Sequence, residues 1–208
     1  KTETPMNPYY FGFKVDDTTK PRITQLAIYP LNDNSSVNGK NQFKKIIPLY
    51  SNGRYSLLKT DTLLVNGDIG FGIECYDTEN KSSGKNSVFS IELQSGGKRI
   101  FYSELEKISF ENARYVNTHA DYAEKQKHNS KIQKCFLSKN NRLEIYKDVL
   151  NAGVINFTDD SVHWIRYVVK DFAGNTSELS LKVKSTSKTM IKMVAVPTSP
   201  VFDCFKDN

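Results

Sequence analysis

Apolar and polar residues alternate along several short stretches of this chain, and turn-forming residues separate these stretches. The clearest case is 163–185, where Ile165, Tyr167 and Val169 fall on one face of an extended strand. After the polar turn DFAGNTS, the same alternation resumes. A period of two residues on both sides of a turn predicts a β-hairpin. We interpret its Asp-containing turn as scaffold, closed by side-chain hydrogen bonds to the backbone.

The same pattern recurs in most of the remaining sequence. Asn-Gly or Gly-Gly pairs, which favour tight hairpin turns, stand at Asn38–Gly39, Asn52–Gly53 and Gly96–Gly97. We interpret the Asn-Asn pair at Asn140–Asn141 in the same way. We therefore predict strands or hairpins over 22–31, 43–58, 62–77, 86–105 and 135–146. This density of short strands and turns predicts an all-β fold of the sandwich type.

One of these stretches, 62–77, also carries a packing prediction. Alternate residues from Ile69 to Cys75 are apolar and share one side of the predicted strand. Gly70 and Gly72 lie on the opposite side. Because glycine has no side chain, we expect a neighbouring segment to approach the strand closely there.

Residues 103–129 differ from the rest of the chain. The sequence SELEKISFENARYVNTHADYAEKQKHN is polar and helix-tolerant and contains few β-branched residues. We predict a partly helical excursion between strands, with Phe110, Tyr115 and Tyr122 as its apolar anchors. A second, short helix is predicted at 147–151, because a glycine follows it as a stop signal.

The composition is that of a folded protein, with 208 residues of which 38% are hydrophobic and 25% charged. It suggests a lead-in over 1–13, a β-domain over 14–185 and an exit rich in Ser, Thr, Lys and Pro over 186–208. No stretch approaches the roughly 20 apolar residues of a membrane-spanning helix, and no N-terminal signal pattern is present. Because the chain begins with Lys1 and ends without a closing pattern, we expect a fragment of a longer protein.

The net charge of +6 raises the question of a nucleic-acid partner. The 29 Lys and Arg residues are spread along the sequence, without a run longer than two. Proteins that bind phosphate backbones usually concentrate their cations on one face. We therefore predict scattered solvent-facing lysines and no nucleic-acid partner. A basic exterior favours anionic polymers such as cell-wall material only weakly.

The three cysteines, Cys75, Cys135 and Cys204, are far apart and follow no zinc-binding spacing. Cys75 and Cys135 lie within apolar runs, so we interpret them as small buried hydrophobic residues. A disulfide between these two stays open, because the sequence does not place them in contact.

The histidines do not suggest a catalytic metal site. His119 and His128 are nine residues apart, which is not a helical ligand spacing, and His119 is two residues from Asp121. His163 precedes a predicted strand, where an exposed or capping role is expected. No Gly-x-Ser-x-Gly elbow is present, and no histidine is near Cys135 in the sequence.

Acidic residues offer a weaker signal. Pairs such as Asp159 and Asp160 are common on protein surfaces, so they do not indicate a glycosidase. Asp16, Asp17, Asp77 and Asp171 stand at predicted strand ends and are of the type that ligates calcium, although the turn-forming role of Asp also explains them. We therefore predict no catalytic, cofactor-binding or metal-binding residue in this chain.

Two stretches resemble known families. VVKDFAGNTSELSLKVK resembles the final hairpin of bacterial immunoglobulin-like domains, whose turn follows the pattern Asp-x-x-Gly-Asn-x-Ser/Thr. The opening resembles the Pro-x-Asn-Pro segment that closes lysostaphin-type (LytM-like) peptidoglycan metallopeptidases, through Pro5, Met6, Asn7 and Pro8. The later stretches GFGIECYD, VFSIEL, FENARYVNTHADY, KCFLSKNNRLEIY, GVINFTDD and KDFAGNTS resemble, in order, the region after the peptidase in Gram-negative envelope members of that family.

The resemblance implies an immunoglobulin-like antiparallel sandwich downstream of the catalytic domain, in the periplasm or cell envelope. The family's zinc-binding motifs have no counterpart in this sequence, so the zinc is expected in the preceding peptidase domain, which would also be the partner of this region. The stretch YYFGF, residues 9–13, which includes the aromatic cluster Tyr9–Phe11, would then be the contact between the domains. Peptidoglycan or envelope proteins are further expected partners.

Two rival hypotheses stay open. The first is a stand-alone adhesion or glycan-binding sandwich, for which exposed aromatic side chains such as Trp164 or Tyr9 would be needed. The second is an enzyme in its own right, which would require a metal site or a nucleophile that the sequence does not reveal.

Overall fold

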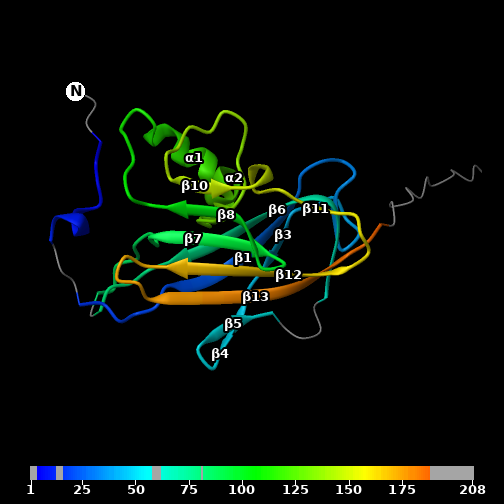
Figure 1. Cartoon of the computed structure of the whole chain (residues 1–208), viewed down its shortest axis with the longest axis horizontal. Coiled ribbons are helices and arrows are strands. Elements are labelled where there is room, and N and C mark those ends of the chain that lie inside the picture. Colours follow the sequence, from blue (N-terminus) through cyan, green and yellow to red (C-terminus); the bar gives the residue numbers. More distant parts are fainter. Residues whose placement is uncertain (1–3, 13–15, 58–61, 81, 188–208) are drawn as a thin grey trace, which may run out of the picture.

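The structure is a computed structural model, and it describes residues 4–12, 16–57, 62–80 and 82–187 (Figure 1). Most of its regular structure is β-strand. The strands are β1 (Arg22–Pro30), β2 (Ser36–Val37), β3 (Lys44–Ile46), β4 (Leu49–Ser51), β5 (Arg54–Ser56), β6 (Leu63–Tyr76), β7 (Ser90–Ser95), β8 (Lys98–Glu104), β9 (Gln133–Lys134), β10 (Tyr146–Val149), β11 (Ile155–Phe157), β12 (Val162–Lys170) and β13 (Thr176–Ser185). The helices are short: η1 (Pro8–Phe11), η2 (Ala113–Tyr115), α1 (Val116–His119), α2 (Tyr122–His128) and η3 (Asn151–Gly153).

The strands form one curled, mixed sheet in the order β10-β8-β7-β12-β13-β6-β1-β3. Figure 1 shows β1, β3 and β6 lying behind β7, β12 and β13. The all-β prediction is confirmed. The expectation of a purely antiparallel arrangement is wrong, because β13 runs parallel to β5 and to the start of β6.

The parallel pairing has its origin in the length and bend of β6. Leu63–Val65 pair with the end of β13, whereas the residues from Ile69 to Tyr76 pair with β1. Between them Gly67 has a φ of 74°, and a Cβ there would lie 2.7 Å from Ser35 Oγ. Only glycine fits this position without strain, and the strand can therefore turn from one part of the sheet to the other.

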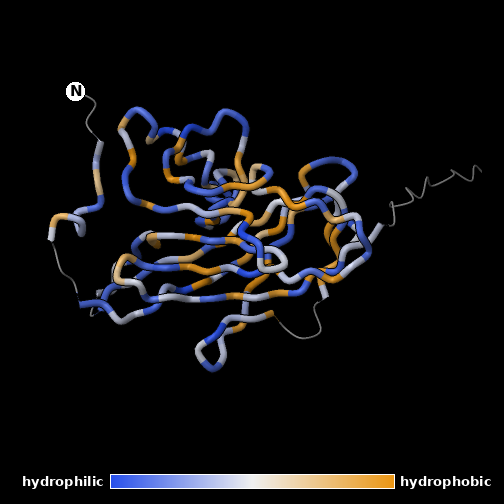
Figure 2. The backbone as a smooth tube through the Cα atoms, viewed as in Figure 1, coloured by the Kyte–Doolittle hydropathy of each residue, from blue (hydrophilic) through white to orange (hydrophobic). Residues whose placement is uncertain are grey.

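The core lies between the two parts of the curled sheet, and the alternation in the sequence predicts it well. Ile165, Tyr167 and Val169 of β12 are fully buried against alternate residues of β13. The hydroxyl of Tyr167 donates to the Gly72 carbonyl at 3.2 Å, so this buried polar group is satisfied. Figure 2 shows apolar residues recurring along the paired strands, with more hydrophilic loops around them.

The packing prediction for β6 is confirmed. The apolar residues from Ile69 to Cys75 are buried. On the other side, a Cβ on Gly70 would lie 2.7 Å from the Phe136 ring, and one on Gly72 would lie 2.9 Å from Ile132. The segment around β9 therefore covers this side of β6 at a distance that only glycine allows.

The hairpin predictions hold in three places, one of which is the hairpin of β12 and β13, and fail in one. Asn52–Gly53 joins β4 to β5, and Gly96–Gly97 joins β7 to β8. The hairpin predicted over 135–146 is wrong, because β10 begins at Tyr146 and pairs with β8. Asn140 does adopt a turn conformation with a φ of 64°, but the chain does not fold back onto itself there.

The helical excursion is present, with η2, α1 and α2 following the end of β8. Two of the three residues predicted to anchor it, Phe110 and Tyr122, do not do so, because they are 67% and 51% exposed. His119 is the buried residue of α1. The helix predicted at 147–151 is also wrong: most of this stretch is β10, followed by η3.

Cys75 and Cys135 are both buried free thiols, as the prediction of small core residues requires, and they form no disulfide with each other. Burial raises the pKa of both thiols. Cys204 and most of the predicted exit over 186–208 lie outside the described residues. None of the helices in the described part is long and apolar enough to cross a membrane.

Candidate functional site

Three of the four aspartates that stand at strand ends converge at one end of the molecule. Asp17, Asp77 and Asp171 each offer a carboxylate oxygen, and these oxygens lie within 4.8 Å of one another. We call this group the aspartate cluster. Asp16, the fourth candidate from the sequence, is exposed and does not belong to it.

The turn between β12 and β13 fixes Asp171. The Asn175 backbone N–H donates to Asp171 Oδ1 at 2.8 Å, and the Asn175 side-chain amide donates to Oδ2 at 2.8 Å. Gly174 completes the turn with a φ of 94°. These contacts confirm the side-chain hydrogen bonds predicted to close the turn, and they also hold a buried carboxylate at a defined place.

Asp17 is fixed by the segment that leads into β1. Its Oδ1 accepts a hydrogen bond from the Thr19 N–H at 2.9 Å. Its backbone carbonyl accepts one from the Asn175 side chain at 3.0 Å, so the turn that holds Asp171 also holds Asp17. Asn80 fastens the same segment to the end of β6 by donating to the Asp16 carbonyl at 2.8 Å.

Asp77 directly follows β6, and its backbone pairs with that of Asn86 at 2.9 Å in both directions. The residue is 7% exposed. Its Oδ1 is buried and accepts no hydrogen bond within the part of the chain that the structure describes. Burial, followed by the nearby charge of Asp171, raises the pKa of Asp77 to about 6.

The cluster brings three acidic side chains together at one place. Across residues 4–12, 16–57, 62–80 and 82–187, none of the three carboxylates takes part in a salt bridge. Lys85, next to Asn86 in the sequence, has its ammonium 4.5 Å from the Tyr76 ring centre. Three oxygen donors with this charge are of the type that binds a hard divalent cation.

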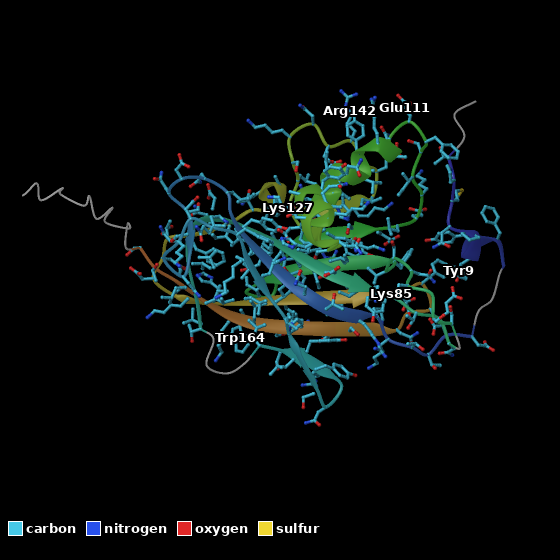
Figure 3. The ribbon with its side chains drawn as sticks, turned by 180° about the vertical axis from the view of Figure 1, so that it is seen from behind. Tyr9, Lys85, Glu111, Lys127, Arg142 and Trp164 are labelled. Atoms are coloured by element: carbon cyan, nitrogen blue, oxygen red, sulfur yellow. The ribbon has the colours of Figure 1, made fainter. Side chains whose placement is uncertain are left out.

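The lead-in packs on the same end of the molecule. Tyr9 stacks on Phe172 with 5.0 Å between ring centres, and its hydroxyl donates to Glu79 at 2.5 Å. That hydrogen bond and burial raise the pKa of Tyr9 to about 12. Figure 3 shows Tyr9 on the short helix η1, at the edge of the molecule.

A hollow of about 320 Å³ lies between the lead-in and the β-domain, beside their contacts. Asp77 contributes to its wall, so the hollow adjoins one member of the cluster. The other lining residues come from the lead-in, the segment between β6 and β7, the residue after β8 and the turn after β12: Asn7, Tyr9, Glu79, Asn86, Ser87, Val88, Phe89, Leu105 and Phe172.

The histidines noted in the sequence lie in separate places. His119 Nε2 is 3.1 Å from Gln133 Oε1, and its Nδ1 is 3.2 Å from the Tyr146 hydroxyl. Asp121 caps α2 and accepts from Tyr29, so it does not face His119 as a shared ligand. His163 contacts Asp159 at 2.9 Å through Nε2.

Trp164 meets the requirement for an exposed aromatic side chain. It is 53% exposed on β12, and the Lys182 ammonium lies 4.6 Å from its ring centre. Figure 3 shows Trp164 and Tyr9 on different parts of the surface.

No protein-family model, no curated protein and no solved structure matches this chain.

The sequence suggested the members of the cluster but not their convergence. Asp77 and Asp171 directly follow β6 and β12, and Arg22 at the start of β1 pairs with Tyr76 at the end of β6. Asp17 therefore arrives at the same sheet end as Asp77. The position of each Asp at the end of a predicted strand indicates a possible site. Predicting that the three side chains meet also requires the order of the strands in the sheet.

Proposed function

We propose that this chain is a noncatalytic accessory region of a peptidoglycan zinc metallopeptidase in the cell envelope, with an immunoglobulin-like β-sandwich at its centre. Its role is to position or regulate the catalytic domain that precedes it. The order of sequence stretches that resemble such proteins supports this function. The turn at Asp171–Asn175 and the two sheet parts that share one core support the immunoglobulin-like arrangement.

The observation that carries the proposal is the docking of the lead-in on the β-domain. The backbone of Asn7 donates to Glu106 at 3.0 Å, and Ile108 donates to Pro5 at 3.3 Å. Together with the Tyr9–Phe172 stack, these contacts hold the lead-in in one direction relative to the β-domain, and under the proposal this is the direction of the preceding domain. A fixed exit direction is what an accessory region needs in order to orient a neighbour.

The outward side of the lead-in is apolar. Met6, Tyr10 and Phe11 are 47%, 48% and 67% exposed, although Tyr10 also meets the edge of Phe172. Under the proposal, the preceding peptidase domain covers these side chains. The Tyr9–Phe11 cluster would then be part of the contact between the domains, with Tyr9 facing the β-domain and Phe11 facing the peptidase domain.

The test uses the longer protein that the proposal implies. Deleting 14–208 should change its peptidoglycan hydrolysis, its regulation or its stability. Replacing Phe172 by Ala should change hydrolysis in the same direction by releasing Tyr9, whereas Phe110→Ala, at a site 67% exposed on the excursion, should not. Unchanged hydrolysis, folding and partner binding after the deletion would contradict the proposal.

A glycan-binding module is the second candidate, and the exposure of Trp164 favours it. A pull-down of this chain on purified peptidoglycan, with Trp164→Ala and Tyr9→Ala variants, separates the two functions. Binding that is lost with Trp164→Ala supports the glycan-binding module. Absence of binding by the unaltered chain rules it out for this polymer.

A further inference from the structure

We propose that Asp17, Asp77 and Asp171 form a binding site for Ca²⁺. The site joins three segments that are distant in the sequence: the approach to β1, the end of β6 and the turn between β12 and β13. It is independent of the accessory role proposed above, and either proposal can fail without the other.

The spacing of the donors fits a single ion. Calcium holds carboxylate oxygens at about 2.3–2.6 Å, so two oxygens on one ion are separated by at most about 5 Å. The three carboxylate oxygens already lie within 4.8 Å of one another. Calcium accepts irregular geometry and completes its shell with water, which the adjacent hollow beside Asp77 can admit.

The second observation is the unpartnered oxygen of Asp77. A buried polar atom without a hydrogen bond is costly, and native proteins rarely keep one without a reason. Asp77 is 7% exposed, its Oδ1 has no partner among the described residues, and its carboxylate faces the other two. A bound cation supplies the missing partner.

Turn formation explains the other two aspartates but does not explain Asp77. Asp171 accepts two hydrogen bonds from Asn175, and Asp17 accepts one from Thr19. These bonds hold both carboxylates in place before an ion arrives, which lowers the cost of forming the site. No comparable turn hydrogen bond to Asp77 Oδ1 is found among the described residues. A bound ion would account for the burial of this carboxylate beside two others.

Charge points in the same direction. The chain as a whole is basic, with a net charge of +6. Even so, within the described part no Lys, Arg or His forms a salt bridge with the cluster. Oxygen donors without nitrogen or sulfur favour calcium over zinc. Magnesium requires a nearly ideal octahedral shell, whereas calcium accepts the irregular arrangement of donors that a fixed backbone provides.

The experiment measures calcium binding by this chain directly. Chelator-treated protein is titrated with CaCl₂ by isothermal titration calorimetry, and its thermal unfolding is followed with and without about 10 mM Ca²⁺, a level that saturates sites of extracellular modules. We expect one bound ion and a rise in melting temperature of about 5–10 °C. No binding heat and no shift at this concentration would overturn the proposal.

Variants test the assignment to these residues. Asp77→Asn and Asp17→Asn should abolish both the binding heat and the shift, while Asp16→Asn, the exposed neighbour, should keep them. Because Asp77→Asn removes a buried charge, it should fold at least as well as the unaltered chain in chelator, and its melting curve there verifies this. A calcium response that survives in Asp77→Asn, or an equal response to MgCl₂ or ZnCl₂, would contradict a calcium site at this cluster.

Discussion

His119 and Asp77 are buried to the same extent, 7% exposed each, but their polar atoms are satisfied to different degrees. A neutral His119 with its proton on Nε2 donates to Gln133 and accepts from Tyr146, so both ring nitrogens have partners. Asp77 keeps an oxygen without a partner in the described chain and faces two further carboxylates. His119 is therefore a buried polar group with a structural role, whereas Asp77 is arranged as a ligand-binding group would be.

The largest effect is expected from breaking the satisfied site. Replacing His119 by Ala removes a buried ring and leaves Gln133 and Tyr146 without their partner, which should cost about 3 kcal/mol of unfolding free energy. Urea unfolding at pH 7.5 measures this. His128→Ala, at an exposed site, should change the unfolding free energy by less than about 0.5 kcal/mol. A loss below about 1 kcal/mol for His119→Ala would mean that the network is not structural.

The opposite sign is expected at Asp77. In chelator at pH 7.5, Asp77→Asn should stabilise the fold by about 1–3 kcal/mol, because burial and Asp171 raise the pKa of Asp77 from 3.8 to about 6. The folded state binds this proton more tightly than the unfolded state, so stability falls as the pH rises from about 4 to about 6.

Unfolding in chelator at several pH values checks both the sign and the window. The gain from Asp77→Asn should grow between pH 4 and pH 6 and stay level above it, whereas Asp16→Asn should show no such change. The groups that act on Asp77 besides Asp171 are Asp17, Glu79 and the Thr78 N–H. Destabilisation by Asp77→Asn at pH 7.5 would show that its carboxylate is already satisfied.

The contribution of His119 to stability should depend on pH with the opposite sign to that of Asp77, and the effect should be smaller. Burial lowers the pKa of His119 below its ordinary value of 6.5, so the unfolded state takes up a proton first as the pH falls. The stabilisation by His119 is therefore present above pH 6.5 and decreases below it. The difference in unfolding free energy between the unaltered chain and His119→Gln, measured from pH 8 down to pH 5, should shrink. A constant difference would contradict a neutral buried ring.

The smallest effect is expected at an exposed pair, which provides a baseline for both buried sites. Trp164→Ala removes the contact between Lys182 and the ring, which is worth about 0.5–1 kcal/mol at an exposed position. Thermal unfolding should therefore change by only a few degrees. A loss as large as that of His119→Ala would mean that Trp164 is part of the packing.

Strand pairing that depends on local alternation was predicted well. The hairpin of β12 and β13, the turns at Asn52–Gly53 and Gly96–Gly97, and the close approach at Gly70 and Gly72 all follow from residues near one another in the sequence. Residues 135–146 show the limit of such reasoning. Leu143 and Ile145 alternate as a strand would, but the next strand pairs with β8 instead.

The candidate site shows the same limit more clearly. The type of each residue was visible in the sequence, and so was the role of Asp171 and Asn175 in a turn. What the sequence could not supply was the bend of β6 at Gly67 and the pairing of its far end with β1, which bring Asp77 beside Asp17. The buried state of Asp77 depends equally on this long-range arrangement.

The continuous strand β6 has a consequence for how the molecule melts. Its 14 residues pair with β13 at the start of the strand and with β1 from Ile69 to its end. Because both parts of the sheet share this strand, neither part can separate from the other without breaking its pairing with β6. Unfolding of the β-domain should accordingly be a single cooperative event. Amide protons of β6 should exchange with solvent only on this global opening, whereas those of the more exposed helix α2 exchange earlier through local fraying.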